Sequence, residues 1–460
     1  MESTNLDIFE RLPVPKAVQK MIVPTIMGQL IVLIYNMADT FFLGRTGNPY
    51  MVAGASLILP VYNISLALSA MSSMGGGPLI SRLLGTKDID EARKVSSFCT
   101  YLSVFIAIFF SLLIALFLDP LMSLLGADSD TAPYARSYAI CVLVFGCLPT
   151  VLSSALSNLL RSVGESKKSG FGITMGGIIN IGLDPLFMFV LLPEGMEVVG
   201  AGVATAISNF IVCIYFIVVI RGLGSESVLK LYPVTRLPSR KSIRETLVVG
   251  FPAAVNNLLF DLDYAIIGRL MSSYTGIAVA AAGIVLKIER LPLNIGIGIS
   301  QGMMPIVAYN YAANNYERMR HTVRYSRRLG IICAAISIIL YEIFAGQLVN
   351  FFILNAETVL LGTKFLRIRV LATPFMFLCF FTVFIFNAFG MGKNTLFLTL
   401  MRWIIFNIPM LFILEHFIGM FGIVMSQFCA DVLAATVSLI FYTHFERSLL
   451  SNPDQIRNEV

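Results

Sequence analysis

The sequence predicts an all-α polytopic membrane protein, with twelve transmembrane helices in two lobes of six. Three observations predict this fold class: an apolar composition, twelve apolar runs, and an internal repeat of a six-span unit. Of the 460 residues, 57% are hydrophobic and 13% are charged, whereas soluble domains are about 45–50% apolar and about 25% charged. This composition excludes soluble enzymes and soluble nucleic-acid-binding proteins.

Twelve apolar runs, separated by polar breaks, each provide roughly the 20 residues that a helix needs to cross the hydrocarbon core. The first run is expected to stay in the mature protein, because it ends in the polar residues 35–39 and not in a cleavage site of small residues. The runs cover residues 19–43, 53–79, 95–118, 138–159, 170–192, 199–220, 246–268, 277–307, 329–349, 370–389, 396–414 and 420–443.

The basic residues predict the orientation. With the N-terminus in the cytoplasm, the cytoplasmic segments hold most of the 33 lysines and arginines, including Arg161, Lys167 and Lys168 after the fourth run. Lys364, Arg367 and Arg369 fall in an outer loop. The bias follows the positive-inside rule and predicts a multi-pass protein of the cell membrane with both termini cytoplasmic. Because the basic residues are spread over many loops, the net charge of +6 indicates no nucleic-acid partner.

The end of the first run repeats at the end of the seventh. Residues 35–45 and 259–269 share Asp, Gly and Arg at one offset (268 − 44 = 224), and Pro78 matches Pro305 at 227. Asn180 and Asn407 are also 227 residues apart. The repeat predicts an N-terminal lobe at 1–221, a basic cytoplasmic linker at 222–244 and a C-terminal lobe at 245–460. Because six spans is an even number, the two copies should be parallel in the membrane.

Duplicated six-span bundles are a transporter architecture, with the substrate route at the repeat interface. The sequence contains no HExxH, GxSxG or Walker A motif, so it offers no site for hydrolysis of peptide, ester or ATP. Its seven cysteines include no CxxC pair. We therefore expect a carrier of small molecules that is not an enzyme and has no cofactor.

Polar residues inside the first, fifth and sixth runs predict a cation or proton site. Asp39 lies near the end of the first run, with Asn36 one turn before it, and ionisable residues in a membrane are presumed functional. Asn180 and Asp184 are spaced i, i+4 and share one helix face, and Thr205 begins the sixth run. The oxygens of these side chains suit Na⁺ as ligands. Alternatively, the carboxylates of Asp39 and Asp184 share a proton. Alternatively, Asp39 and Asp184 only cap their helices, which leaves Asn180 unexplained.

The second lobe contains a different charged set. Asp261 and Asp263 lie in the seventh run, and Lys287, Glu289 and Arg290 lie in the eighth. These residues form either an ion-pair cluster that holds the two spans together or a substrate-recognition site in the cleft. Because residues two apart cannot share one helix face, we expect only one aspartate, Asp261, to pair with Lys287 and Arg290.

The sequence resembles the multidrug and toxic compound extrusion (MATE) family over nearly its whole length. The matching segments are YNMADT at 35–40 with Gly44 and Arg45, Asn180 with Asp184 and Pro185, GAGVAT at 200–205, and PIVAYNYA at 305–312 with Glu317 and Arg318. Ala312 stands where relatives often have glycine. The resemblance implies twelve helices in two lobes around a V-shaped central cleft, and export driven by Na⁺ or H⁺ antiport.

In the DinF-like branch, which this sequence resembles most, the N-lobe site uses an aspartate of the first span, an asparagine and an aspartate of the fifth, and a nearby threonine. These match Asp39, Asn180, Asp184 and Thr205. Another branch relies on acids in the seventh and tenth spans. Asp261 lies near the first of these positions, but residues 375–389 contain no acid. The resemblance therefore implies a coupling site in the first lobe.

Three functions follow as hypotheses. The first is a monomeric antiporter that exports amphipathic drugs or toxic metabolites by alternating access, coupled to Na⁺ or H⁺. The second is a flippase for a lipid-linked precursor from the same superfamily, which would use several cavity arginines to bind a pyrophosphate. The third is a membrane sensor or scaffold, whose function would not depend on Asp39.

Overall fold

Twelve long helical segments form the molecule in the computed structural model, which describes residues 3–224, 227–231 and 237–451. The first six are α2 (Val14–Arg45), α3 (Pro49–Gly85), α4 (Ile89–Leu116), α6 with α7 (Ala132–Ala139 and Cys147–Ser162), α8 (Ser166–Leu186) and α9 (Glu197–Gly222). The second six are α10 (Arg240–Met271), α11 (Gly276–Ala312), α12 (Tyr316–Phe352), α13 with α14 (Ala356–Val370 and Thr373–Phe389), α15 with α16 (Gly392–Leu400 and Ile408–Ile418) and α17 (Met420–Ser451).

Shorter elements complete the chain. Helices α1 (Ser3–Glu10) and α5 (Leu118–Leu124) lie outside the twelve segments. Three π-helical segments continue or join longer helices: η1 (Ile140–Phe145), η2 (Phe187–Leu191) and η3 (Met401–Asn407). Part of the linker predicted at 222–244 lies outside the described residues, and the predicted lobe boundaries stay a prediction.

Within the described residues, eight helices are long and apolar enough to span a membrane, or ten when the bent pairs α6–α7 and α13–α14 each count as one span. Helices α10 and α11, of 32 and 37 residues, complete the twelve and carry the charged residues predicted for the second lobe. The predicted all-α polytopic fold is therefore confirmed. The helices extend beyond the apolar runs, since a helix continues through polar residues past the membrane core; α12, for example, begins at Tyr316 and not at residue 329.

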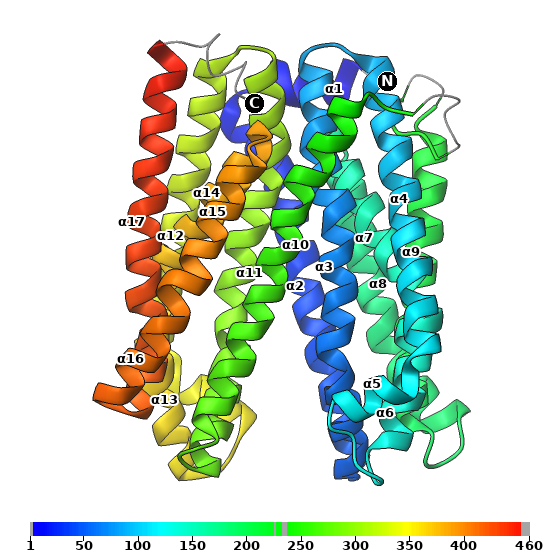
Figure 1. The fold of residues 1–460 in the computed structure, drawn as a ribbon, viewed down its shortest axis with the longest axis vertical. Helices are drawn as coiled ribbons and strands as arrows, with labels where there is room; N and C mark the ends of the chain where they lie inside the picture. Colours follow the sequence, from blue (N-terminus) through cyan, green and yellow to red (C-terminus); the bar gives the residue numbers. More distant parts are fainter. Residues whose placement is uncertain (1–2, 225–226, 232–236, 452–460) are drawn as a thin grey trace.

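The helices form two halves that meet along a central seam (Figure 1). We call α1–α9 the N-half and α10–α17 the C-half. Helix α3 packs against α10, and α2 packs against α11. At the α3–α10 crossing, a Cβ added at Gly75 would overlap the carbonyl oxygen of Thr246, and one at Gly250 would overlap that of Met71. Only glycine lets the two backbones approach this closely.

The hydrophobic core is shared at one end of the molecule and divided at the other. At the end where α1 lies and α17 finishes, which we call the terminal end, one cluster joins residues of both halves, from Phe9 and Ile80 to Ile306 and Phe386. Towards the opposite end, where α5, α6, α13 and α16 lie, the core splits into one cluster of residues 43–201 and another of residues 267–424. The halves are therefore held together at the terminal end.

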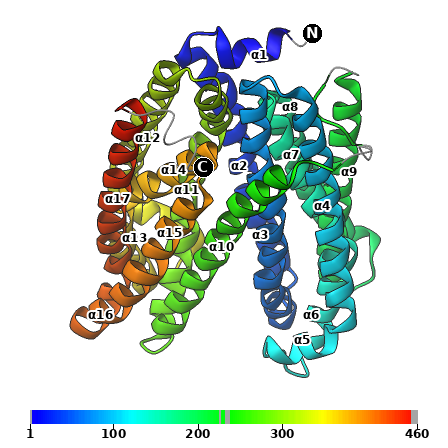
Figure 2. The same cartoon turned by 45° about the horizontal axis from the view of Figure 1, so that its top comes forward.

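Several polar contacts across the seam also lie at the terminal end. Arg82 of α3 donates to Glu245 of α10 at 2.5 Å. Helix α1 lies across this end of the molecule (Figure 2), and Arg318 of α12 donates to the carbonyl oxygens of Phe9 at 2.6 Å and Leu12 at 2.6 Å. These bonds satisfy carbonyls at the end of α1 that have no partner within the helix. The end of α1, which belongs to the N-half, is thus hydrogen-bonded to α12 of the C-half.

Candidate functional site

The N-half brings together the four residues predicted as a cation or proton site. Asp39 comes from α2, Asn180 and Asp184 from successive turns of α8, and Thr205 from α9; α8 packs against both other helices. The carboxyl groups of Asp39 and Asp184 are close enough to interact electrostatically. The Asn180 amide lies 3.4 Å from the Thr205 hydroxyl, to which it donates. Asp184, Asn180 and Thr205 are buried, and Asp39 is partly buried.

Four oxygens of this cluster are buried without a hydrogen-bond donor among the described residues. They are Oδ1 of Asp39, both carboxylate oxygens of Asp184 and Oδ1 of Asn180. A buried carboxylate is costly unless it is paired or protonated. Carboxylate, amide and hydroxyl oxygens are the ligands that hard cations prefer. The donor set therefore fits a small hard cation such as Na⁺, and the paired acids equally fit a proton.

Local sequence shapes this part of α8. Pro185 follows Asp184 inside the helix, and it has no N–H to donate to the carbonyl of Ile181. Just beyond, α8 passes into the π-helical segment η2 at Phe187. Such π-helical turns occur frequently at functional sites. The same stretch that carries the acid thus departs from regular helix geometry.

Next to the four residues lies a cavity of about 270 Å³. Asn180 and Thr205 line it, whereas Asp39 and Asp184 do not; each follows a lining residue, Tyr35 or Asn180, by one helical turn. Its remaining lining comes mainly from α2, α3, α7, α8 and α9, and Asn257 of α10 and Gln301 of α11 extend it to the C-half. The predicted cleft residue Asn36 is exposed, does not line this cavity, and donates to the carbonyl of Val32 at 2.8 Å.

In the C-half, the buried acids Glu289 and Asp431 have arginine partners. Both guanidinium contacts of Arg369 to Glu289 are short, at 2.5 and 2.8 Å, and the Tyr264 hydroxyl donates to the same carboxylate at 2.8 Å. Arg402 contacts Asp431 at 2.7 and 3.2 Å. We call these two ion pairs the C-half charge network.

The predicted pairing of Asp261 with Lys287 and Arg290 is wrong. Asp261 forms no ion pair within 4 Å with Lys287 or Arg290 in the described part of the chain. Its electrostatic interaction with Arg290 acts over a longer distance. Arg290 instead lies over the Tyr264 ring, 5.0 Å from its centroid, and Lys287 is exposed.

Asp263, and not Asp261, is the buried aspartate of α10. Its side chain accepts a hydrogen bond from Asn407 of η3 at 2.5 Å. The physical reason is the helical period: residues two apart point to different sides, and the side of α10 that packs into the C-half is the one with Asp263.

Neither arginine of the C-half charge network was predicted from the sequence as a site residue. Arg369 lies in α13, which the charged residues around it had placed in an outer loop, but its side chain is buried. Arg402 lies inside the eleventh apolar run, and a basic residue within an apolar run was the available signal of a buried ion pair.

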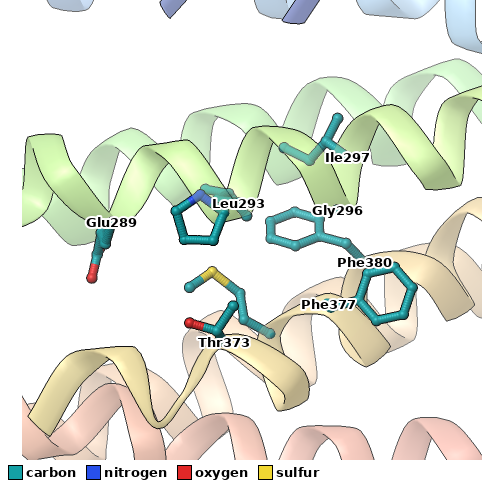
Figure 3. A pocket seen from close by; sticks show the side chains of 9 residues that line it. Glu289, Leu293, Gly296, Ile297, Thr373, Phe377 and Phe380 are labelled. Carbon is teal, nitrogen blue, oxygen red and sulfur yellow. The ribbon is translucent and has the colours of Figure 1, made fainter. Parts of the chain in front are cut away.

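Little free space remains beside this network. A cavity of about 10 Å³ is lined by Glu289 and Leu293 of α11 and by Thr373, Phe377 and Phe380 of α14 (Figure 3). That volume is about one water molecule. No group of three or more His, Cys, Asp or Glu residues that could hold a metal ion occurs in the described ranges. The cavity beside Asn180 and Thr205 is therefore the better candidate for a ligand site.

Comparison with known proteins agrees with this geometry. The model of the MatE family matches residues 24–186 and 252–413. The second match begins 228 residues after the first (252 − 24), close to the offsets of the internal repeat. The multidrug export protein MepA of Staphylococcus saprophyticus is 26% identical over 440 residues, which cover 96% of each chain. MepA of Staphylococcus aureus is 27% identical over 441 residues, again 96% of each chain.

Solved structures share the fold over almost the whole chain. A crystal structure of a MATE protein in complex with MaL6 has a TM-score of 0.91 at 21% identity, covering 97% of this chain and 99% of that one. The chain therefore belongs to the MatE family of membrane transporters, and it is not an enzyme.

Proposed function

We propose that this protein exports amphipathic drugs or toxic metabolites by alternating access, in exchange for Na⁺ or H⁺ bound at Asp39, Asn180, Asp184 and Thr205. Its relatives named multidrug export proteins support the substrate class. One cation moved through 100 mV supplies about 2.3 kcal/mol. A transporter uses this free energy only if the cation and the substrate act on the same moving element.

One observation carries the proposal: a cluster with four buried oxygens that have no donors among the described residues adjoins a cavity of about 270 Å³. Asn180 and Thr205 belong to both, because they line the cavity and contact each other in the cluster. A cation or proton bound in the cluster therefore changes the charge and geometry of the cavity itself. This set of four residues also supports a DinF-like mode of coupling.

In this proposal, the structure represents the transport state that is open to the outside of the cell. In the described residues, the halves share a core only at the terminal end. The spread of basic residues supports a cytoplasmic location for that end, with the protein in the cell membrane. Opening inward would require the Arg82–Glu245 pair and the bonds between Arg318 and the end of α1 to break. The cavity and the four-residue site are formed by one chain, which supports function as a monomer.

The flippase alternative receives less support. Recognition of a lipid-linked pyrophosphate would require several basic residues in one cavity. Among the residues that line the cavity, Arg161 alone is basic. A drug-sized amphipathic molecule fits this lining of hydroxyls, amides and apolar side chains better.

The proposal is tested by transport of a cationic dye such as ethidium in proteoliposomes. Dye flux is measured under an imposed Na⁺ gradient, an imposed pH gradient and no gradient, with protein-free liposomes as the control. One of the two gradients should accelerate export and identify the coupling ion. Flux that equals the protein-free control, or that responds to neither gradient, would contradict the proposal.

A further inference from the structure

Arg161 differs from the other buried arginines. Among the described residues, four arginine side chains are buried: Arg82, Arg161, Arg369 and Arg402. Three of them are paired with a carboxylate, namely Glu245, Glu289 and Asp431. Arg161, which is 6% exposed, forms no ion pair within 4 Å in the described part of the chain. Burying a cation without a carboxylate partner costs free energy, and such cations are rare inside membrane proteins.

The hydrogen bonds of Arg161 all go to neutral groups. Its guanidinium donates to Oδ1 of Asn158 at 2.8 Å, to Oε1 of Gln301 at 3.0 Å and to Oγ of Ser157 at 3.2 Å. Its Nε is buried and has no acceptor in the described ranges. A carboxylate would give this guanidinium a charged acceptor in place of the neutral ones, and such charge-assisted hydrogen bonds are the stronger kind.

Arg161 faces the same cavity as Asn180 and Thr205, from its opposite end. The α7 residues of the lining extend from Thr150 to Arg161, a rise of about 16 Å along the helix. Thr150 accepts a hydrogen bond from Asn209 at 2.9 Å and lies beside Tyr62, which interacts electrostatically with Asp39. Acidic residues therefore lie near one end of the cavity, and the basic residue Arg161 lies at the other end.

Apolar side chains lie between these ends. Ile173, Val212 and Phe216 line the cavity together with Leu66 and Met74. This order of acid, apolar wall and arginine is complementary to an amphipathic molecule with a cationic group at one end and a carboxylate at the other. A purely cationic molecule would leave the Arg161 charge uncompensated.

We propose that Arg161 binds the carboxylate of zwitterionic amphipathic substrates, and so makes the cavity prefer a zwitterion over its cationic ester. This inference rests on the proposed function only in taking the cavity as the substrate site. Hydrogen bonds to charged groups are stronger than neutral ones, so the zwitterion should bind about tenfold more tightly than the ester.

The test uses a matched pair of fluorescent ligands: rhodamine B, which carries a free carboxylate, and rhodamine B ethyl ester, in which that group is masked. Fluorescence anisotropy with the purified full-length protein gives both dissociation constants. The wild type should favour rhodamine B by about tenfold, and Arg161→Gln should bind the two dyes equally. Arg136→Gln, which changes an exposed arginine outside the cavity, should keep the wild-type preference.

Arg161→Lys keeps the charge without the planar fork, so its preference should lie between those of wild type and Arg161→Gln. This variant carries the test if Arg161→Gln does not fold. Sodium benzoate should displace rhodamine B, whereas sodium chloride at the same concentration should not. Equal affinity of the wild type for both dyes would overturn the inference, and so would equal competition by chloride, which would indicate a site for inorganic anions.

The outcomes separate this inference from the proposed function. If the ester is exported under a gradient but the binding preference is absent, the role of Arg161 is wrong and coupled export stands. If the preference follows Arg161 but neither gradient drives flux, the carboxylate site stands and coupled export is wrong.

Discussion

In the N-half, Asp39 and Asp184 lie beside a cavity of about 270 Å³ and have carboxylate oxygens without donors, whereas in the C-half Glu289 and Asp431 are each paired with an arginine. The repeated positions differ less, because Asp263 also has one carboxylate oxygen buried without a donor in the described residues, but its other carboxylate oxygen has one. Asn407, the counterpart of Asn180, donates to Asp263, the counterpart of Asp39, at 2.5 Å. Asn180 donates to Thr205 instead.

The difference shows what a duplicated bundle can do with buried acids. An arginine that is fixed to a carboxylate by two short hydrogen bonds already supplies its counter-charge, so an incoming cation would have to displace it. Carboxylates without donors have no such occupant and can take up and release a cation or proton. We therefore propose that exchange occurs in the N-half and that the C-half charge network stabilises the fold.

The largest expected effect is on folding of the C-half. Arg369→Met leaves Glu289 buried without its counter-charge, which typically costs about 3–5 kcal/mol. The purified protein should melt at a much lower temperature, or fail to accumulate. Adding Glu289→Leu should restore much of the stability, because no buried charge then remains.

Arg367→Met provides the matched control for this effect. Arg367 lies two residues away on α13, and its contact with Glu342 at 3.4 Å is exposed. Exposed pairs contribute about 0–1 kcal/mol. Equal melting temperatures for Arg367→Met and Arg369→Met would mean that the C-half charge network does not stabilise the fold.

Replacing Asp184 should give the opposite pattern. Asp184→Asn removes a buried charge that has no donor, so the melting temperature should stay the same or rise. Gradient-driven flux in proteoliposomes should fall to the rate without a gradient. A large loss of stability with normal coupling would reverse the roles of the two halves.

The repeated asparagines offer a smaller and more direct comparison. Asn407→Ala removes the donor to Asp263 and should destabilise the protein by about 1–3 kcal/mol. Asn180→Ala should leave the melting temperature nearly unchanged but raise the concentration of coupling cation needed for half-maximal transport. Thermal melts and transport titrations of both variants decide the comparison, and similar behaviour of the two would contradict it.

The smallest effect is expected at Lys287. Its side chain is exposed and has no ion pair within 4 Å in the described residues. Lys287→Met should therefore change the free energy of unfolding by no more than about 0.5 kcal/mol. A larger loss of stability in a thermal melt would indicate that Lys287 pairs with Asp261, which the structure does not support.

Much of the fold was predictable because a bilayer leaves few solutions for an apolar chain: every backbone group must be satisfied within its own helix. Polar residues within apolar runs are easily recognised for the same reason, and these include Asp39, Asn180, Asp184 and Thr205. The structure brings these four side chains together from three helices.

The sequence could not supply the partners of buried charges. Arg369 follows a charged stretch that resembles a loop, and Arg161 follows an apolar run and precedes two lysines, so hydropathy placed both outside the membrane. Their burial depends on how α13 and α7 pack. The choice between Asp261 and Asp263 likewise depends on which side of α10 faces the C-half, and a local pattern does not specify this.

The central claim is tested most directly by gradient-driven export in proteoliposomes containing Asp39→Asn. Asp119→Asn, which alters an exposed acid of the N-half, serves as the control. We predict that Asp39→Asn transports the dye at the same rate with and without the gradient, while Asp119→Asn responds to it as the wild type does. Export by Asp39→Asn that the gradient accelerates as it does in the wild type would contradict the assignment of cation exchange to the N-half.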